Sequence, residues 1–315
     1  MTSGIARYLL RRLLAGVLVV LGAATLTFFA VHLVPGQIVD AMLGPGTVAT
    51  PELRQQVITE NGLDQPLLVQ YLDKLGALVT GDLGRSYVQG QPVARLLAEQ
   101  VGPTVDLALA ALATALALAV VAAVLTAGRG RVARAVASAI GLLAVSVPSF
   151  WLGIVLLTVF SFQLNVFPAV GDLGPAGLVL PALALALPLA GVLSQVISQE
   201  LATTEGKPFV LTARARGLGE TNLLLRHTLR HALLPVTTLS GFILGSLFGG
   251  AVLVENIFSR PGLGRVLVDA VGSRDIPVVT ALVLLSAVVF VVVNTIVDLL
   301  HPLIDPRLAD GRGQV

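Results

Sequence analysis

The chain has no cysteine among its 315 residues. This absence excludes disulfide bridges, thiolate metal sites and a cysteine nucleophile together. Charged residues are also scarce, at 12% of the chain, against about 25% in an average soluble protein. Hydrophobic residues make up 55%. These proportions indicate a membrane protein.

Lysine occurs only twice, as Lys74 and Lys207. Neither residue completes a Gly-x-x-x-x-Gly-Lys-Ser/Thr loop, so we expect the chain to bind no nucleotide itself. The sequence also lacks the His-Glu-x-x-His and Gly-x-Ser-x-Gly motifs of metalloproteases and α/β-hydrolases. No catalytic constellation converges, and we expect the chain not to be an enzyme.

Two further site classes are disfavoured by the basic residues. His227 and His231 stand four apart and could share a helix face, but Arg226 and Arg230 beside them would repel a cation. We therefore expect no metal site. The net charge is only +2, and the arginines stand at the ends of apolar runs. That distribution is typical of membrane orientation rather than of nucleic-acid binding.

Six stretches have the roughly 20 mainly apolar residues that a membrane-spanning helix needs. They lie approximately at 10–31, 104–127, 136–160, 179–201, 236–258 and 278–300. A cleaved signal peptide is the alternative for the first stretch, since Val39-Asp40-Ala41 weakly resembles a cleavage site. Its apolar run is longer than a usual signal core, so we expect a retained helix. The predicted fold is an all-α membrane protein with six spans.

Arginines set the expected orientation. Arg7, Arg11 and Arg12 precede the apolar run Leu13–Val31 of the first span, and three more arginines stand between the second and third spans, which places these segments in the cytoplasm by the positive-inside rule. Both termini are then cytoplasmic. The predicted parts are the N-terminus and first span (1–31), an extracytoplasmic segment (32–103), a five-helix core (104–300) containing a cytosolic loop (202–235), and a cytosolic tail (301–315).

The segment 32–103, which we call the cap, shows local order. Helical spacing over Leu67–Leu78 predicts a helix, and Thr80–Gly84 has turn composition. The other predicted external segment, Glu255–Gly264, is expected to form a turn between the fifth and sixth spans. The cap therefore reads as a small folded element rather than a linker.

Several spans carry residues that are unusual in a membrane helix. Pro148 in the third predicted span indicates a kink, either for packing or for substrate contact. Four glycines in the fifth span allow close helix approach; they are Gly241, Gly245, Gly249 and Gly250. From polarity and depth, the candidates for a translocation path are Ser149, Gln195, Ser198 and Asn294.

Residues 212–235 form a basic, amphipathic island between two apolar spans. Small residues up to Gly219 suit a tight turn and a close protein contact. Pro235 is expected to open the fifth span, where proline is tolerated in the first helical turn. On these grounds alone, an interfacial helix without a partner stays the alternative.

Short motifs follow one another along nearly the whole chain. They are Tyr8–Leu13, Leu33–Gly36, Leu63–Tyr71, Gly81–Ser86, Ser146–Trp151, Thr212–Leu218, Leu225–Arg230, Ala232–Pro235, Glu255–Phe258, Pro261–Gly264, Arg274–Asp275, Asp298–Leu300 and Asp305–Arg307. In this order they resemble the permease subunits of binding-protein-dependent ABC importers, and most closely the dipeptide, oligopeptide and nickel branch. The family's leading Glu-Ala-Ala letters are here Leu211-Thr212-Ala213, so the glutamate is missing.

The resemblance implies a transport subunit of the bacterial inner membrane. Its partners are a second permease, one or two cytosolic ATPases that carry the ATP and Mg²⁺, and an extracytoplasmic substrate-binding protein; no nucleic acid and no cofactor of its own are implied. The residues implied in ATPase docking are Ala213, Arg214, Ala215, Arg216, Gly217, Leu218, Glu220, Arg226, Arg230 and Pro235.

Short peptides are the expected cargo, and nickel, a metallophore or another small solute is the alternative within the family. Gln195 and Ser198 stand where the peptide branch often has an arginine, and such a change near the path alters selectivity. Outside the family, the alternatives are a membrane scaffold and an intramembrane enzyme.

Overall fold

The computed structural model describes residues 2–33, 37–43, 50–126, 129–169, 174–204, 207–223 and 229–304. Over these residues the chain is helical, and its only β-type pairing is an isolated bridge between Arg85 and Pro92. The contacts divide the chain into two compact units. Unit 1 comprises Met1–Gly102 and Gly262–Val291, and unit 2 comprises Pro103–Pro261 and Val292–Val315.

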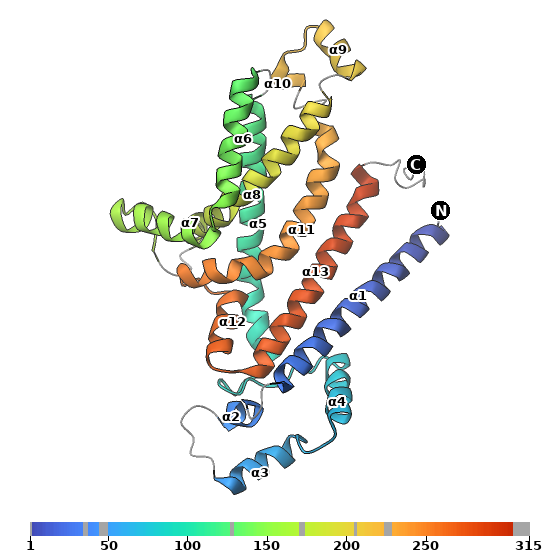
Figure 1. Ribbon diagram of the computed structural model, residues 1–315, viewed down its shortest axis with the longest axis vertical. Coiled ribbons are helices and arrows are strands. Elements are labelled where there is room, and N and C mark those ends of the chain that lie inside the picture. Colours follow the sequence, from blue (N-terminus) through green and yellow to red (C-terminus); the bar gives the residue numbers. More distant parts are fainter. Residues whose placement is uncertain are drawn as a thin grey trace. The chain divides into compact units, whose positions relative to one another are not determined.

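Unit 1 contains one long helix and several short ones (Figure 1). Its elements are α1 (Thr2–His32), α2 (Gln37–Leu43), α3 (Pro51–Glu60), α4 (Leu67–Val79), the start of α5 (Val93–Thr126), α12 (Leu263–Gly272) and the first part of α13 (Ile276–Ile304). The predicted helix at Leu67–Leu78 is confirmed as α4. The predicted turn after it is confirmed by the left-handed backbone of Gly81 and Gly84, with φ of 79° and 81°. α12 has no counterpart among the predicted elements.

Unit 2 is a bundle around α8 (Figure 1). Its elements are the rest of α5, α6 (Arg131–Ser146), α7 (Ser149–Leu156), the π-helix η1 (Leu157–Gln163), α8 (Pro175–Thr204), α9 (Pro208–Ala215), α10 (Glu220–Leu223), α11 (Leu229–Ile257) and the end of α13. α8 packs against α6, α7 and α11. On α5, Leu107, Ala111, Ala115 and Ala119 repeat every four residues and are buried, so one stripe of mostly small side chains faces the core.

Within the residues that the structure describes, five helices are long and apolar enough to cross a membrane. They are Leu10–His32, Val93–Thr126, Pro175–Thr204, Ala232–Gly249 and Ile276–Leu299. A sixth span exists if the bent pair Val132–Ser146 and Ser149–Gln163 counts as one. The predicted all-α membrane fold is confirmed.

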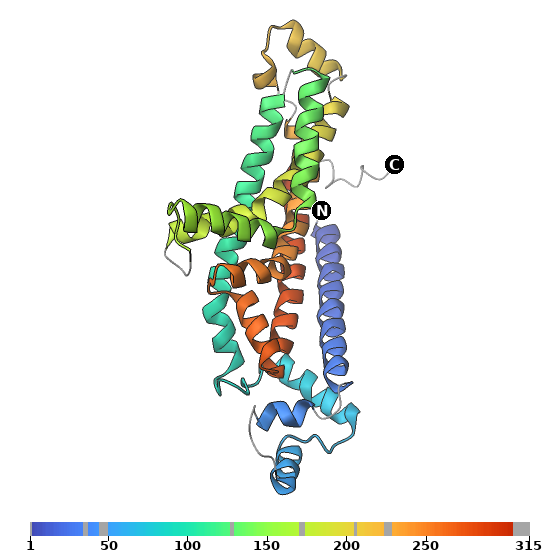
Figure 2. The ribbon, with the colours of Figure 1, turned by 60° about the vertical axis from the view of Figure 1, so that its left-hand side comes forward.

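The predicted kink at Pro148 is larger than a packing kink. The two segments meet at 95°, and α7 with η1 turns away from α6 as an arm (Figure 2). Val147, just before the proline, has an extended backbone (φ −90°, ψ 124°), because a residue that precedes proline is disfavoured in the helical region. The predicted kink in the span over 136–160 is therefore present, as a sharp break between α6 and α7.

Glycines set the closest helix contacts of unit 2. A Cβ on Gly191 of α8 would lie 2.5 Å from the carbonyl oxygen of Gly141 on α6. A Cβ on Gly241 of α11 would lie 2.4 Å from Val297 Cγ2 on α13. The expected close approach is confirmed at Gly241, whereas nothing lies within 4 Å of a Cβ on Gly249. Only glycine fits the first two positions without moving a neighbour.

Candidate functional site

The segment after α8 folds into two short helices at the end of unit 2 where α8 ends and α11 begins (Figure 1). Pro208 opens α9, where its missing N–H is not needed. One turn later the Thr212 hydroxyl donates to the carbonyl of Pro208 at 2.9 Å. The local sequence therefore starts and supports α9 without help from the bundle.

Gly217 makes the turn between α9 and α10. Its φ is +80°, a left-handed conformation that glycine adopts without strain. The amide of Leu218 donates to the carbonyl of Ala213 at 3.2 Å, which closes the end of α9 in the manner of a glycine C-cap. No atom lies within 4 Å of where a Cβ on Gly217 would stand. The tight turn predicted here is present, and its outer side is open.

The α9–α10 pair has a small core of its own. Val210, Ala213 and Leu223 are buried at 1%, 8% and 2% exposure, and Leu218 packs against them. The opposite face stays open, since the Leu211 side chain is 57% exposed. The pair therefore holds its own shape while presenting a surface that the rest of unit 2 does not cover.

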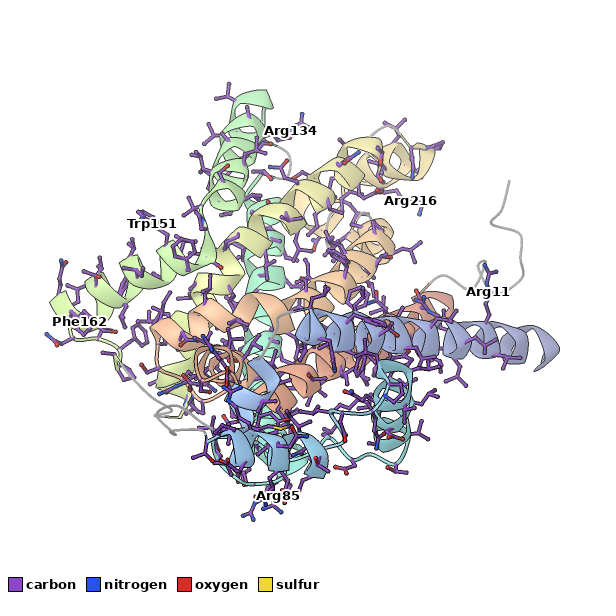
Figure 3. The ribbon with its side chains drawn as sticks, turned by 60° about the horizontal axis from the view of Figure 1, so that its bottom comes forward. Arg11, Arg85, Arg134, Trp151, Phe162 and Arg216 are labelled. Carbon is purple, nitrogen blue, oxygen red and sulfur yellow. The ribbon has the colours of Figure 1, made fainter. Side chains whose placement is uncertain are left out.

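The remaining residues predicted for this loop are placed as follows. Ala215 and Arg216 are exposed, and the Arg216 side chain extends away from the ribbon (Figure 3). The backbones of Arg214, Glu220 and Arg230 lie in α9, α10 and α11, respectively. Arg226 lies outside the described residues.

Pro235 does not open the fifth span. α11 begins at Leu229, so Pro235 is its seventh residue and stands inside the helix. The proline cannot donate to the carbonyl of residue 231. Ala232 and Val236 are nevertheless buried in the core of unit 2, at 0% and 9% exposure. Packing of these neighbours keeps the segment helical through the proline, which local sequence rules do not reveal.

Gln195, a candidate for the translocation path, joins two helices. Its Nε2 donates to the carbonyl of Ser138 at 3.0 Å, and the Ser138 hydroxyl donates to its Oε1 at 3.1 Å. The contact lies beside Gly141, where a Cβ would stand 2.9 Å from Gln195 Nε2. Because both ends of the amide are bonded to α6, Gln195 fixes α6 against α8.

The other path candidates do not gather around Gln195. Ser198 is exposed one turn further along α8, Ser149 is half-buried at the start of α7, and Asn294 is half-buried on α13. Within the part of the chain that the structure describes, no hydrogen bond joins Ser149 to Gln195 or Ser198. The four residues therefore stay candidates without a common site.

Glu255 lies elsewhere than predicted. The prediction put it in an external turn, but it lies within α11 and is fully buried. The hydroxyl of Thr104, also fully buried, donates to Glu255 Oε1 at 2.7 Å. An acidic residue at the end of an apolar helix was the available signal, because intramembrane carboxylates usually have a specific partner.

Asp275 joins distant parts of unit 1. Its carboxylate is 3% exposed and accepts hydrogen bonds from the Ser86 hydroxyl and from the amides of Tyr87 and Val88, the amides at 3.1 and 3.4 Å. Burial and the nearby Asp275 charge raise the pKa of Tyr87 to about 12, since both disfavour the tyrosinate. This carboxylate holds the loop around Ser86–Val88, which we call the cap loop, against the turn between α12 and α13.

Comparisons with known proteins match almost the whole chain. The family model described as "Binding-protein-dependent transport system inner membrane component" matches residues 115–310, and that of the membrane component's N-terminal part matches residues 5–108. A putative peptide transport system permease protein of Brucella abortus is 39% identical over 309 residues, covering 95% of this chain and 98% of the relative.

A second relative and a solved structure agree with this match. The glutathione transport system permease protein GsiC of Salmonella choleraesuis is 36% identical over 305 residues, covering 96% of this chain and 98% of that protein. A chain of the inward-facing MetNI methionine ABC transporter aligns with a TM-score of 0.53 and 16% identity, covering 67% of this chain and 97% of that one. This last likeness concerns the fold alone.

Proposed function

The chain belongs to the family of binding-protein-dependent transport system inner membrane components, and we propose that it forms, with a second permease, the path by which an ABC importer takes up short peptides. Relatives named for peptide and glutathione transport, matched over nearly their full lengths, support this cargo. Glutathione is itself a short peptide. The chain is thus the membrane part of an importer.

The proposed setting is the inner membrane of a bacterium, with both termini in the cytoplasm. The apolar helices supply the spans. Arg11 at the N-terminal end of the first span supports this orientation, as do Arg129 and Arg134 at the start of α6. With this orientation the α9–α10 pair faces the cytoplasm and the cap faces outward. The proposed parts of the chain keep the predicted boundaries: the N-terminus with the first span (1–31), the cap (32–103), the five-helix core (104–300) and the cytosolic tail (301–315).

We assign docking of the cytosolic ATPases to the α9–α10 pair, residues 208–223, within the loop 202–235; we call this pair the coupling unit. The observation that carries the assignment is the turn at Gly217, whose outer side is open over a helix pair with its own core. Such an element can be pushed as a rigid body. The exposed Arg216 offers charge to a partner.

The proposed free energy source is ATP bound with Mg²⁺ on the partner ATPases, since neither lysine of this chain lies in a P-loop. Closure of the ATPases moves the coupling units, and the two permeases switch between inward-open and outward-open arrangements. A substrate-binding protein delivers peptide at the outer side. These partners are implied by the family and, together with this chain, make up the proposed importer.

The test is ATP-dependent uptake of radiolabelled tri-alanine by proteoliposomes holding the full transporter. Gly217→Asp places a charged side chain on the open side of the turn and strains a backbone with φ of +80°, at a cost of about 1–3 kcal/mol. We expect uptake to fall at least about tenfold, which corresponds to about 1.4 kcal/mol, while insertion into the membrane is unchanged.

Gly219→Asp is the matched control, because Gly219 is also open but has no left-handed backbone. If both variants lose uptake, the surface itself contacts the ATPase; if only Gly217→Asp does, the shape of the turn is what matters. Unchanged ATP-driven uptake in both variants would remove the docking assignment. Uptake of Ni²⁺ or a metallophore in place of tri-alanine would overturn the peptide cargo.

A further inference from the structure

Unit 1 contains a cavity of about 620 Å³. Its apolar wall comes from Phe28 on α1, Leu78 on α4 and Pro277 at the start of α13, and Tyr87 adds a second aromatic ring. This volume lies within the range of about 300–1,000 Å³ typical of small-molecule sites. The cavity is far larger than a packing defect and is large enough to hold a small-molecule ligand.

Charged side chains of both signs line the same cavity. Lys74 and Asp73 come from α4, and Asp82 comes from the turn after it. Burial lowers the pKa of Lys74, while the nearby Asp82 charge raises it. Among the residues that the structure describes, the Lys74 ammonium makes no hydrogen bond and no ion pair. A half-buried ammonium without an ion-pair partner favours an anionic group from outside the chain.

The polar wall of the cavity is already fixed. Gln70 Nε2 donates to the carbonyls of Gln65 and Leu63 at 2.8 and 3.1 Å, and its Oε1 lies 3.2 Å from His32 Nε2. The other ring nitrogen of His32 lies 2.8 Å from the carbonyl of Phe28. Because these groups bind each other, the wall is formed before any ligand arrives, which lowers the cost of binding.

We propose that this cavity binds a short peptide with both termini free, in the cap and separate from the candidate path in unit 2. The peptide carboxylate pairs with Lys74, its ammonium pairs with Asp73, and its side chains lie between Phe28 and Tyr87. The proposal rests on the peptide cargo argued above. It assigns the cap the role of a first binding site on the outer side.

The mixture of charges selects this ligand class. An inorganic anion would meet two carboxylates beside the one ammonium, and a metal cation would meet Lys74. A zwitterion satisfies both signs at once, and the aromatic wall suits an uncharged middle portion. A phospholipid with an ethanolamine headgroup shares the zwitterionic chemistry, and the experiment separates it from a peptide.

The test uses the scarcity of lysine in the full chain, purified in nanodiscs. A water-soluble amine-reactive reagent modifies Lys74 in the cavity and the exposed Lys207 outside it, and mass spectrometry reads each site. Tri-alanine at about ten times its dissociation constant should protect Lys74 about tenfold by mass action. Lys207 should stay unprotected and serves as the internal control.

Removing single charges from the peptide and from the protein tests which terminus pairs with which side chain. C-terminally amidated tri-alanine should bind about tenfold or more weakly to the wild type, since one charge-assisted hydrogen bond is lost. Lys74→Met keeps most of the side-chain stem and should remove that difference, whereas Lys207→Met should preserve it. Asp73→Asn should do the same for N-acetylated tri-alanine. These paired losses would assign each terminus to its partner.

Other outcomes overturn the proposal. Protection of Lys74 by ethanolamine-headgroup lipid in the nanodisc, with no effect of tri-alanine, identifies a lipid site instead. Normal tri-alanine uptake by the full transporter without protection at Lys74 removes the cap site and leaves the proposed function intact. Absence of both uptake and protection removes the peptide cargo together with the cap site.

Discussion

In the cap and its neighbours in unit 1, buried hydrogen bonds join residues far apart in sequence, whereas three buried apolar side chains hold the coupling unit together. Ser86 and Asp275 are 189 positions apart and in direct contact. The core of the coupling unit, by contrast, spans only Val210 to Leu223. The cap is tied into its unit by long-range hydrogen bonds, whereas the coupling unit folds locally and is left open.

The cap and the coupling unit differ in whether they depend on a partner protein to cover their surface. The cap loop takes its shape from Asp275, so it can keep a preformed cavity without any partner. The coupling unit keeps an internal shape but exposes Leu211 and the turn at Gly217. A partner surface is what would bury them. We therefore expect the cap to respond to loss of single polar groups and the coupling unit to loss of apolar volume.

The largest expected effect comes from Asp275→Ala. The change leaves the Ser86 hydroxyl and two backbone amides without their acceptor, and hydrogen bonds to a charged group are worth about 1.5–3 kcal/mol each. We expect the loop to be destabilised by about 3–4 kcal/mol, near the upper end for one substitution. Native-state trypsin cleavage after Arg85 should accelerate more than a hundredfold.

Asp275→Asn is the control for that change, since the amide keeps the shape and one acceptor oxygen. Its cleavage rate should lie between those of the wild type and the alanine variant. An unchanged cleavage rate in Asp275→Ala would show that this carboxylate does not hold the cap loop. The contrast between the cap and the coupling unit would then not hold either.

A smaller effect is expected from Leu223→Ala in the coupling unit. Leu223 is 2% exposed, and truncation of a buried leucine costs about 2–5 kcal/mol. We expect the low end, because so small a core can collapse around the gap. Trypsin cleavage after Arg216 reports the opening. Leu211→Ala, at 57% exposure on the same helix pair, should change the free energy of opening of the coupling unit by less than about 0.5 kcal/mol. Equal effects of the two substitutions would show that the coupling unit has no core of its own.

The smallest effect is expected from Tyr71→Phe on α4. The tyrosine hydroxyl lies 2.7 Å from Thr25 Oγ1 on α1, while its ring contacts Phe28 with centroids 5.3 Å apart. Only the hydrogen bond is lost, worth about 0.5–1.5 kcal/mol. Thermal unfolding of the variant, of Thr25→Val and of the double variant forms a cycle. Additive losses would show that the two hydroxyls are not coupled.

Local chemistry predicted the elements that depend on neighbouring residues. The apolar runs gave the spans, Gly217 indicated the tight turn, and the spacing of Leu67–Leu78 indicated α4. Pro148 indicated a kink in the third span. The size of the bend could not be predicted, because it depends on how α7 packs against α8 and α11.

Contacts between distant residues escaped the sequence analysis for the same reason. Neither Ser86 nor Asp275 has a local pattern that names the other, and the burial of Glu255 depends on Thr104 reaching it from α5. The cavity of unit 1 is likewise assembled from α1, α4 and α13. Pro235 was assigned by a rule for helix starts that packing of its neighbours overrides.

The glycine contact on α11 has a mechanical meaning. Gly241 contacts Val297 on α13, and at 1.5 Å per residue it lies, along the helix, about 18 Å from Leu229 and about 21 Å from Glu255. The hydrogen bond from Thr104 holds the Glu255 end of the same helix against α5. α11 is thus held at its middle and near its far end, so a displacement of its Leu229 end is resisted at both points.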